Sequence, residues 1–332
     1  MDFLTTLITV GIMIALAIPG FILKKANMLR DGAVATLVCV LMYVAQPLMV
    51  VDGFLAKDYD PTLLINMAIA FVASLVIHIV MFFIVKFIFM FFKPKKSDES
   101  EQAKRVEDKN KICTICSFLG NAGFMGLPVM KALFPNHPEI LMYTTMVIVA
   151  FNIICWTLGI YVVTGDKNNI GIKRILLNPP TVGAVGGLIL FFIKGYVEIP
   201  SELMVNIERF TGYLGDMTLP LSMIILGVRL AEINFLELYN DWKVYLTCAN
   251  KLILCPIVTF GVLLLVRLVY PALDYYLFAS LFIVLAMPSA SSCLSFAEMF
   301  DSDRQTAVKI TRLSTILSVI TIPFIMLMCS LI

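Results

Sequence analysis

The chain has 332 residues, of which 60% are hydrophobic and only 14% are charged, and its mean hydropathy is +0.93. A water-soluble protein must carry more charge on its surface, so this composition excludes a soluble globular protein. The formal net charge is only +2, and nothing in the sequence resembles a basic patch for binding nucleic acid. The chain is therefore predicted to be an all-α integral membrane protein.

Apolar runs long enough to cross a bilayer recur along the chain, since a spanning helix needs about 20 mostly apolar residues. The ten predicted spans are 3–23, 33–55, 62–92, 112–133, 139–164, 175–196, 202–229, 243–268, 275–299 and 306–331. The first span lacks a preceding basic residue, unlike a secretory signal, so we expect it to be retained. Residues 93–111 form the longest polar stretch and are predicted to be a solvated loop, with a regulatory element as the alternative.

Lysine and arginine are distributed unevenly between the connections. Most of them, including Lys24, Lys25 and those of 93–111, follow odd-numbered spans. Because basic residues favour the cytoplasm, these connections are predicted to be cytoplasmic. Both termini of this multi-pass protein should then face outside the plasma membrane.

A weak internal repeat relates the two halves of the chain, 1–164 and 165–332. Its matched stretches, each five spans from its partner, are TVGIMIALAIPGFILKK (9–25) with TVGAVGGLILFFIKG (181–195), QPLMVVDGF (46–54) with LPLSMIILGVRL (219–230), and the segments around Pro128 and Pro288. A repeat with an odd number of spans must be inverted across the membrane. We therefore predict two inverted five-helix repeats.

Spans four and nine are predicted to be broken. The stretch GNAGFMGLPVMKALF (120–134) places glycines and Pro128 inside span four, and LAMPSASSCLSF (285–296) places Pro288 inside span nine. Proline removes a backbone donor, and the freed groups need protein or water as partners. We expect the two breaks to cross at mid-membrane, with half-helices that begin near the prolines and aim their N-termini at an anion. A kink that serves only packing is the alternative.

The predicted binding residues surround these breaks. They are Gly120, Asn121, Gly123, Met125 and Pro128 in span four, Pro288, Ser289, Ser291 and Ser292 in span nine, and Gln46 and Thr218 in spans two and seven. Neither break contains Asp or Glu, which a sodium–proton antiporter would use to hold its cation. Amide and hydroxyl groups beside helix N-termini instead suit a carboxylate.

Three ionisable residues within spans are candidates for coupling or charge compensation. Asp216 in span seven is either a coupling site or a water-exposed group at a helix bend. His78 in span three either titrates or, as we prefer, bonds to a neighbouring helix. Lys251 in span eight either neutralises a substrate carboxylate or, by a narrow preference, snorkels to the cytoplasmic boundary.

The stretches LGNAGFMGLPVMKALF (119–134), NPPTVGAVGGLIL (178–190) and AMPSASSCLSFAEMF (286–300) resemble the signature segments of the auxin efflux carrier family. They look most like its bacterial branch of malate or malonate permeases. The resemblance covers the whole chain. It implies a scaffold domain of spans one, two, six and seven and a transport domain of spans three to five and eight to ten. It further implies an elevator-type movement, a homodimer, prolines 128 and 288 at the crossing, and a substrate-contacting amide at Asn121.

These observations together predict a secondary transporter for a small organic anion, with H+ or Na+ as candidate coupling ions. Alternatives are a membrane sensor or receptor that binds a ligand at the same crossing, and a cation- or proton-coupled antiporter. No GxxxxGK[ST] or HExxH motif occurs, and no cofactor or metal site is predicted: the CTIC pair, Cys113 and Cys116, lacks further ligands. We do not expect an enzyme.

Overall fold

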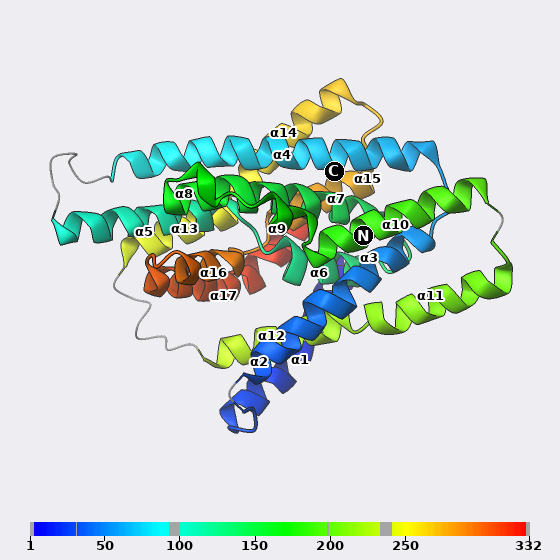
Figure 1. Ribbon diagram of the computed structural model, residues 1–332, viewed down its shortest axis with the longest axis horizontal. Coiled ribbons are helices and arrows are strands. Elements are labelled where there is room, and N and C mark those ends of the chain that lie inside the picture. Colours follow the sequence, from blue (N-terminus) through cyan, green and yellow to red (C-terminus); the bar gives the residue numbers. More distant parts are fainter. Residues whose placement is uncertain (1–2, 31, 93–99, 198, 233–240, 330–332) are drawn as a thin grey trace.

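The computed structural model describes residues 3–30, 32–92, 100–197, 199–232 and 241–329 (Figure 1). Within these ranges the chain is helical and forms no β-strand, in agreement with the predicted all-α class. The helices are α1 (Phe3–Lys25), α2 (Ala33–Val40), α3 (Gln46–Leu55), α4 (Pro61–Met90), α5 (Glu101–Phe118), α6 (Leu127–Leu133), α7 (Glu139–Ile154), α8 (Ile160–Thr164), α9 (Ile172–Leu176), α10 (Pro179–Tyr196), α11 (Ser201–Gly215), α12 (Thr218–Ala231), α13 (Trp242–Ala249), α14 (Cys255–Val269), α15 (Tyr275–Leu285), α16 (Ser292–Met299) and α17 (Arg304–Cys329).

Seven helical segments among the described residues are long and apolar enough to cross a membrane. They are Ala33–Leu55, Pro61–Met90, Glu139–Thr164, Pro179–Tyr196, Ser201–Ala231, Trp242–Val269 and Arg304–Cys329. Two shorter apolar helices, Ala122–Leu133 and Tyr275–Leu285, adjoin the predicted breaks. The molecule is therefore a multi-pass membrane protein.

Several helices continue through a proline by widening one turn. The π-helical turns Leu41–Ala45, Ala122–Gly126 and Asn250–Leu254 each end two residues before a proline, at Pro47, Pro128 and Pro256. A proline ring clashes with the carbonyl four residues earlier, which lies inside the π-helical turn in all three cases. The widened turn moves that carbonyl aside, so the helix bends without ending.

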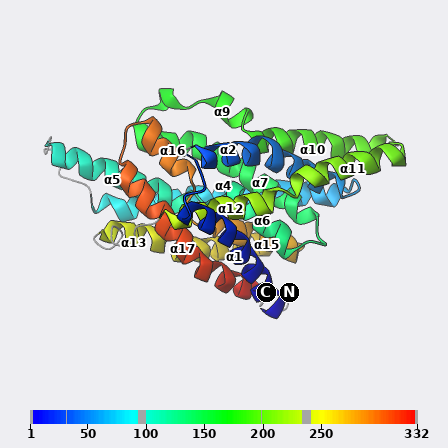
Figure 2. The same ribbon diagram turned by 90° about the horizontal axis from the view of Figure 1, so that it is seen from below.

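Two groups of helices are evident from their packing. The helix α1 lies along α12, and α3 lies against α10 and α11. In the second group α7 packs against α4 and α15. In Figure 1 α4 follows one edge of the molecule, and α1 and α2 run obliquely at the opposite edge. Both views place the start of α1 close to the end of α17 (Figures 1 and 2).

Two predicted boundaries are wrong. The predicted loop 93–111 is helical from Glu101, because Ser100 caps α5 by accepting a hydrogen bond from the amide of Ala103; residues 93–99 lie outside the described ranges. Span six begins only at Pro179, which suits the first position of a helix. Span seven, predicted as 202–229, extends over Ser201–Ala231 and is bent at Asp216, where α11 ends and α12 follows at Thr218.

A close contact between two helices predicts a sensitive position. A Cβ atom at Gly20 of α1 would lie 2.0 Å from the carbonyl oxygen of Ile224 in α12, whereas a Cβ atom at Gly11 would meet nothing within 4 Å. We expect Gly20→Ala to separate α1 from α12 and to lower stability by about 1–3 kcal/mol. Gly11→Ala on the same helix should cause no loss. Thermal unfolding of both purified variants in detergent checks this, and equal unfolding temperatures would contradict it.

Candidate functional site

The two broken helices meet through their backbones. The amide of Asn121 donates to the carbonyl of Pro288 at 2.7 Å, and the amide of Ala290 donates to the carbonyl of Leu119 at 3.0 Å. Gly120 and Ser289 thus form an antiparallel bridge between the two breaks. Where each helix ends, it leaves backbone amides and carbonyls without partners, and the extended segment of the other helix supplies those partners. Such pairing is needed because hydrocarbon offers no water to bond these groups. The predicted meeting of the two breaks is thereby confirmed.

The position of the break in span four differs from the prediction. The half-helix that follows it begins at Ala122, immediately after Asn121, and Pro128 lies buried within that helix after the π-helical turn. Pro128 is therefore not at the crossing, because the widened turn accommodates it. Pro288 does lie at the crossing, where its carbonyl accepts the bond from Asn121.

Lys251 is buried behind the crossing, so the preferred prediction that it snorkels to the boundary is wrong. The residue is 1% exposed, and its Nζ donates to the carbonyl of Leu285 at 2.9 Å. That carbonyl belongs to the last turn of α15 and has no partner within its helix, which favours a cation there. A Cβ atom at residue 120 would lie 2.9 Å from this Nζ, so a side chain there would displace the ammonium from its place beside Gly120.

Two adjoining cavities open beside the crossing. The larger has a volume of about 420 Å³ and the smaller about 60 Å³. Both are lined by Asn121, Phe124, Arg229 and Ser291. Of the other predicted residues, the larger cavity is lined by Gly120, Gly123, Ser292 and Gln46, and the smaller by Met125.

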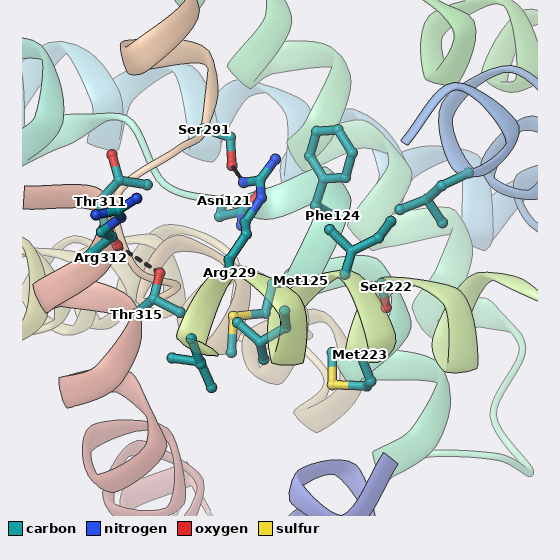
Figure 3. Close-up of a pocket in the computed structure, with 14 residues that line it drawn as sticks. Asn121, Phe124, Met125, Ser222, Met223, Arg229, Ser291, Thr311, Arg312 and Thr315 are labelled. Carbon is teal, nitrogen blue, oxygen red and sulfur yellow. Dashed lines mark hydrogen bonds between the residues drawn. The ribbon is translucent and has the colours of Figure 1, made fainter. Parts of the chain in front are cut away.

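Arg229 stands between the two cavities and is the residue that the sequence reasoning missed. It rises from α12, and its Nη1 donates to the hydroxyl of Ser291 at 2.6 Å (Figure 3). No carboxylate lies within ion-pair distance of it among the described residues; the nearby Glu232 is paired with Lys24 at 2.7 Å. An arginine inside a membrane protein without a carboxylate partner marks a functional site.

Further polar groups complete the lining. Asn178, at the start of α10, turns a side-chain oxygen without a hydrogen-bond partner in the described ranges toward the larger cavity. Arg312 of α17 lies on the far wall of the smaller cavity, beside Thr311 and Thr315 (Figure 3).

On the sequence alone, Arg229 was counted only among the basic residues that follow span seven. Arg229 lies within the apolar stretch LPLSMIILGVRL, before the polar connection begins, and this was the sequence signal that it belongs to the span.

Gln46 links the two helix groups at the larger cavity. Its side-chain amide donates to the carbonyl of Gly123 at 2.8 Å, directly after the break in span four. Asn152 of α7 donates to the hydroxyl of Thr181 of α10 at 3.2 Å and lines the same cavity. The cavity therefore lies between helices from both groups.

The remaining predicted residues do not line these cavities. The hydroxyl of Ser289 donates to the carbonyl of Cys116 at 2.8 Å, so it braces the crossing. Thr218 is buried at the bend between α11 and α12. His78 bonds to the carbonyl of Ser74 in its own helix at 2.7 Å, not to a neighbouring helix as preferred. Its ring packs near Phe151.

Asp216 is exposed and takes part in an ion-pair cluster at the other end of the half-helix that follows Asn121. There Lys131 of α6 contacts Asp216 at 2.8 Å and Asp52 of α3 at 3.3 Å. The carboxylate of Asp52 also accepts a bond from Thr211 of α11 at 3.2 Å. Lys131 is ten residues beyond Asn121, so this cluster lies about 15 Å along the helix from the crossing.

Comparison with known proteins gives the family. Residues 3–326 match the model of a family described as membrane transport protein, and this match covers nearly the whole chain. No curated protein matches the chain. The matched family is that of the auxin efflux carriers whose signature segments the sequence resembles. The chain therefore belongs to this family, and it is a multi-pass membrane transporter.

Proposed function

We propose that the protein is a secondary transporter that carries a small organic anion, a mono- or dicarboxylate such as malate or malonate, across the plasma membrane. The observation that carries this proposal is the guanidinium of Arg229. It has no carboxylate partner in the described ranges, and it faces a cavity of about 420 Å³ where Asn121 and two half-helices meet. A carboxylate there would complete the charge and accept bidentate hydrogen bonds.

The backbone at the crossing adds further donors. The amides of Gly123 and Phe124, in the first turn after the break, have no hydrogen-bond partner in the described part of the chain. The same is true of the amide of Ser292, which begins α16. Both helix ends carry partial positive charge, and both line the larger cavity. An anion held here would accept bonds from both broken helices.

The packing supports an elevator-type mechanism. We assign α1, α2, α3, α10, α11 and α12 to a scaffold domain and the remaining long helices to a transport domain, in two inverted five-helix repeats. The pairs α1–α12 and α3–α10 each join one helix from each repeat. Arg229 and Gln46 belong to the scaffold, whereas Asn121 and Ser291 belong to the transport domain. Movement between the domains would carry the bound anion past the scaffold.

We take the ion-pair cluster to mark the side on which the transporter is closed in this conformation. Lys131 on the transport domain is bonded to Asp52 and Asp216 on the scaffold, while the cavities lie toward Arg229. By the distribution of basic residues, the cavity side is the cytoplasmic one, with both termini outside. We propose H+ or Na+ as coupling ions, and a homodimer on the resemblance alone.

The first test is thermal stabilisation of the purified protein by malate, malonate and lactate, since a ligand of the folded state raises its stability. We expect Arg229→Gln to weaken binding of the stabilising acid by roughly 10- to 100-fold, because one charge-assisted contact is lost. Arg209→Gln, which removes the same charge from an exposed position of α11, is the control. Equal affinity of the Arg229 variant and the wild type would remove Arg229 from the site.

Asn121→Ala tests the amide at the crossing. The backbone bond from Asn121 to Pro288 persists in this variant, so the fold should remain intact while acid binding weakens about tenfold. Asn206→Ala on α11, whose side chain bonds only within its own helix, should bind normally. Titration of the same acid against both variants provides the comparison, and unchanged affinity in a folded Asn121→Ala protein would refute the assignment.

A double-mutant cycle tests the closed side. The side chains of Lys131 and Asp52 are 26% and 22% exposed, so Lys131→Met and Asp52→Asn should show a coupling energy of about 0.5–1 kcal/mol in unfolding experiments. The pair Arg105 and Glu101, with side chains 81% and 89% exposed, should show none. Strictly additive effects at Lys131 and Asp52 would mean that this contact does not hold the two domains together.

A further inference from the structure

A third cavity, remote from the crossing, lies between the end of α4, the middle of α5 and the end of α8. Its volume is about 220 Å³. Its polar side chains are those of Lys86, Glu107, Asn110, Lys111, Thr114 and Tyr161. None of these residues touches the transport site, so the cavity has no part in binding the transported anion.

The depth of this cavity matches the boundary between hydrocarbon and headgroups. Lys111 precedes Asn121 by ten residues, and a rise of 1.5 Å per residue places it about 15 Å from the crossing. With the crossing at mid-membrane, as the proposed function has it, this is half the thickness of a hydrocarbon core of about 30 Å. Lys86 lies one turn before the end of α4, at Met90, and faces the same cavity.

The charges of the two lysines are compensated differently. Lys111 has two carboxylate partners on its own helix, Glu107 at 3.4 Å and Asp108 at 3.1 Å. Lys86 has no carboxylate within ion-pair distance in the described ranges, and its Nζ lies 5.4 Å from the centre of the Phe82 ring. Lys86 is exposed, so its ammonium is accessible to an anionic group from outside the chain, which would pair with it at the boundary.

The apolar side chains around Lys86 indicate which kind of anion would bind there. On α4 the neighbouring side chains Phe83, Phe87 and Met90 are 61%, 58% and 52% exposed, and they form an apolar surface next to the cavity. Acyl chains can cover such a surface, whereas a free aqueous anion cannot. A molecule with a phosphate at one end and acyl chains at the other fits both features.

We propose that this cavity binds the headgroup phosphate of an anionic phospholipid. Lys86 supplies the ion pair, and Tyr161, which lines the same cavity, supplies a hydroxyl as a hydrogen-bond donor. The acyl chains lie along the exposed aromatic face of α4. This site is independent of the transported anion, because it shares no residue with the cavities around Arg229.

The test measures binding of phosphatidylglycerol, with phosphatidylcholine of the same chains for comparison, to the purified full-length protein by native mass spectrometry. We expect retention of phosphatidylglycerol by the wild type, about tenfold weaker retention by Lys86→Gln, and near-normal retention by Lys86→Arg. Lys104→Gln removes the same charge from an exposed position of α5 and should bind normally.

Three results would overturn the proposal. They are equal retention by Lys86→Gln and the wild type, equal retention of the two lipids, and competition by glycerol 3-phosphate at the concentration of the lipid. The last result would identify a site for a soluble phosphate. Acid-induced thermal stabilisation of Lys86→Gln should remain that of the wild type, so failure of this site and failure of the transport site can be told apart.

Discussion

The architecture depends on one exchange of backbone hydrogen bonds, between residues 119–121 and residues 288–290. Within a membrane, a chain that leaves its helix exposes amides and carbonyls that no water can satisfy. Here each break supplies the partners that the other lacks, through Asn121 to Pro288 and Ala290 to Leu119. If only one of the two helices were broken, its freed amides and carbonyls would stay without hydrogen-bond partners. The two interruptions are therefore a single structural unit.

Several features follow from this unit. A side chain at Gly120 would displace the ammonium of Lys251, which satisfies a carbonyl at the end of α15. The hydroxyl of Ser289 bonds back to α5 and stiffens the crossing. Asn121, Ser291 and Ser292 are left to face the cavities. Polar groups at the crossing thus divide into those that hold the backbone and those that remain available to a ligand.

The sequence was sufficient for the helical class, for the breaks and for the residues around Asn121, because glycines and a proline inside an apolar run disfavour an unbroken helix. The prediction placed the break in span four too close to Pro128. The sequence pattern does not distinguish a proline that breaks a helix from one that a π-helical turn accommodates. The prediction also misjudged Lys251 and overlooked Arg229. Whether a long basic side chain points to the boundary or to the interior depends on tertiary packing, here on the carbonyl of Leu285 and the hydroxyl of Ser291.

The proposed function is the carriage of an organic anion across the bilayer. Binding of the acid does not test this, because a receptor would bind it as well. The most direct test is exchange of a labelled carboxylate, chosen as the acid that stabilises the protein most, into proteoliposomes preloaded with the same unlabelled acid. We expect uptake that saturates and that is abolished by omitting the protein. Stabilisation by the acid without any exchange across the membrane would contradict it.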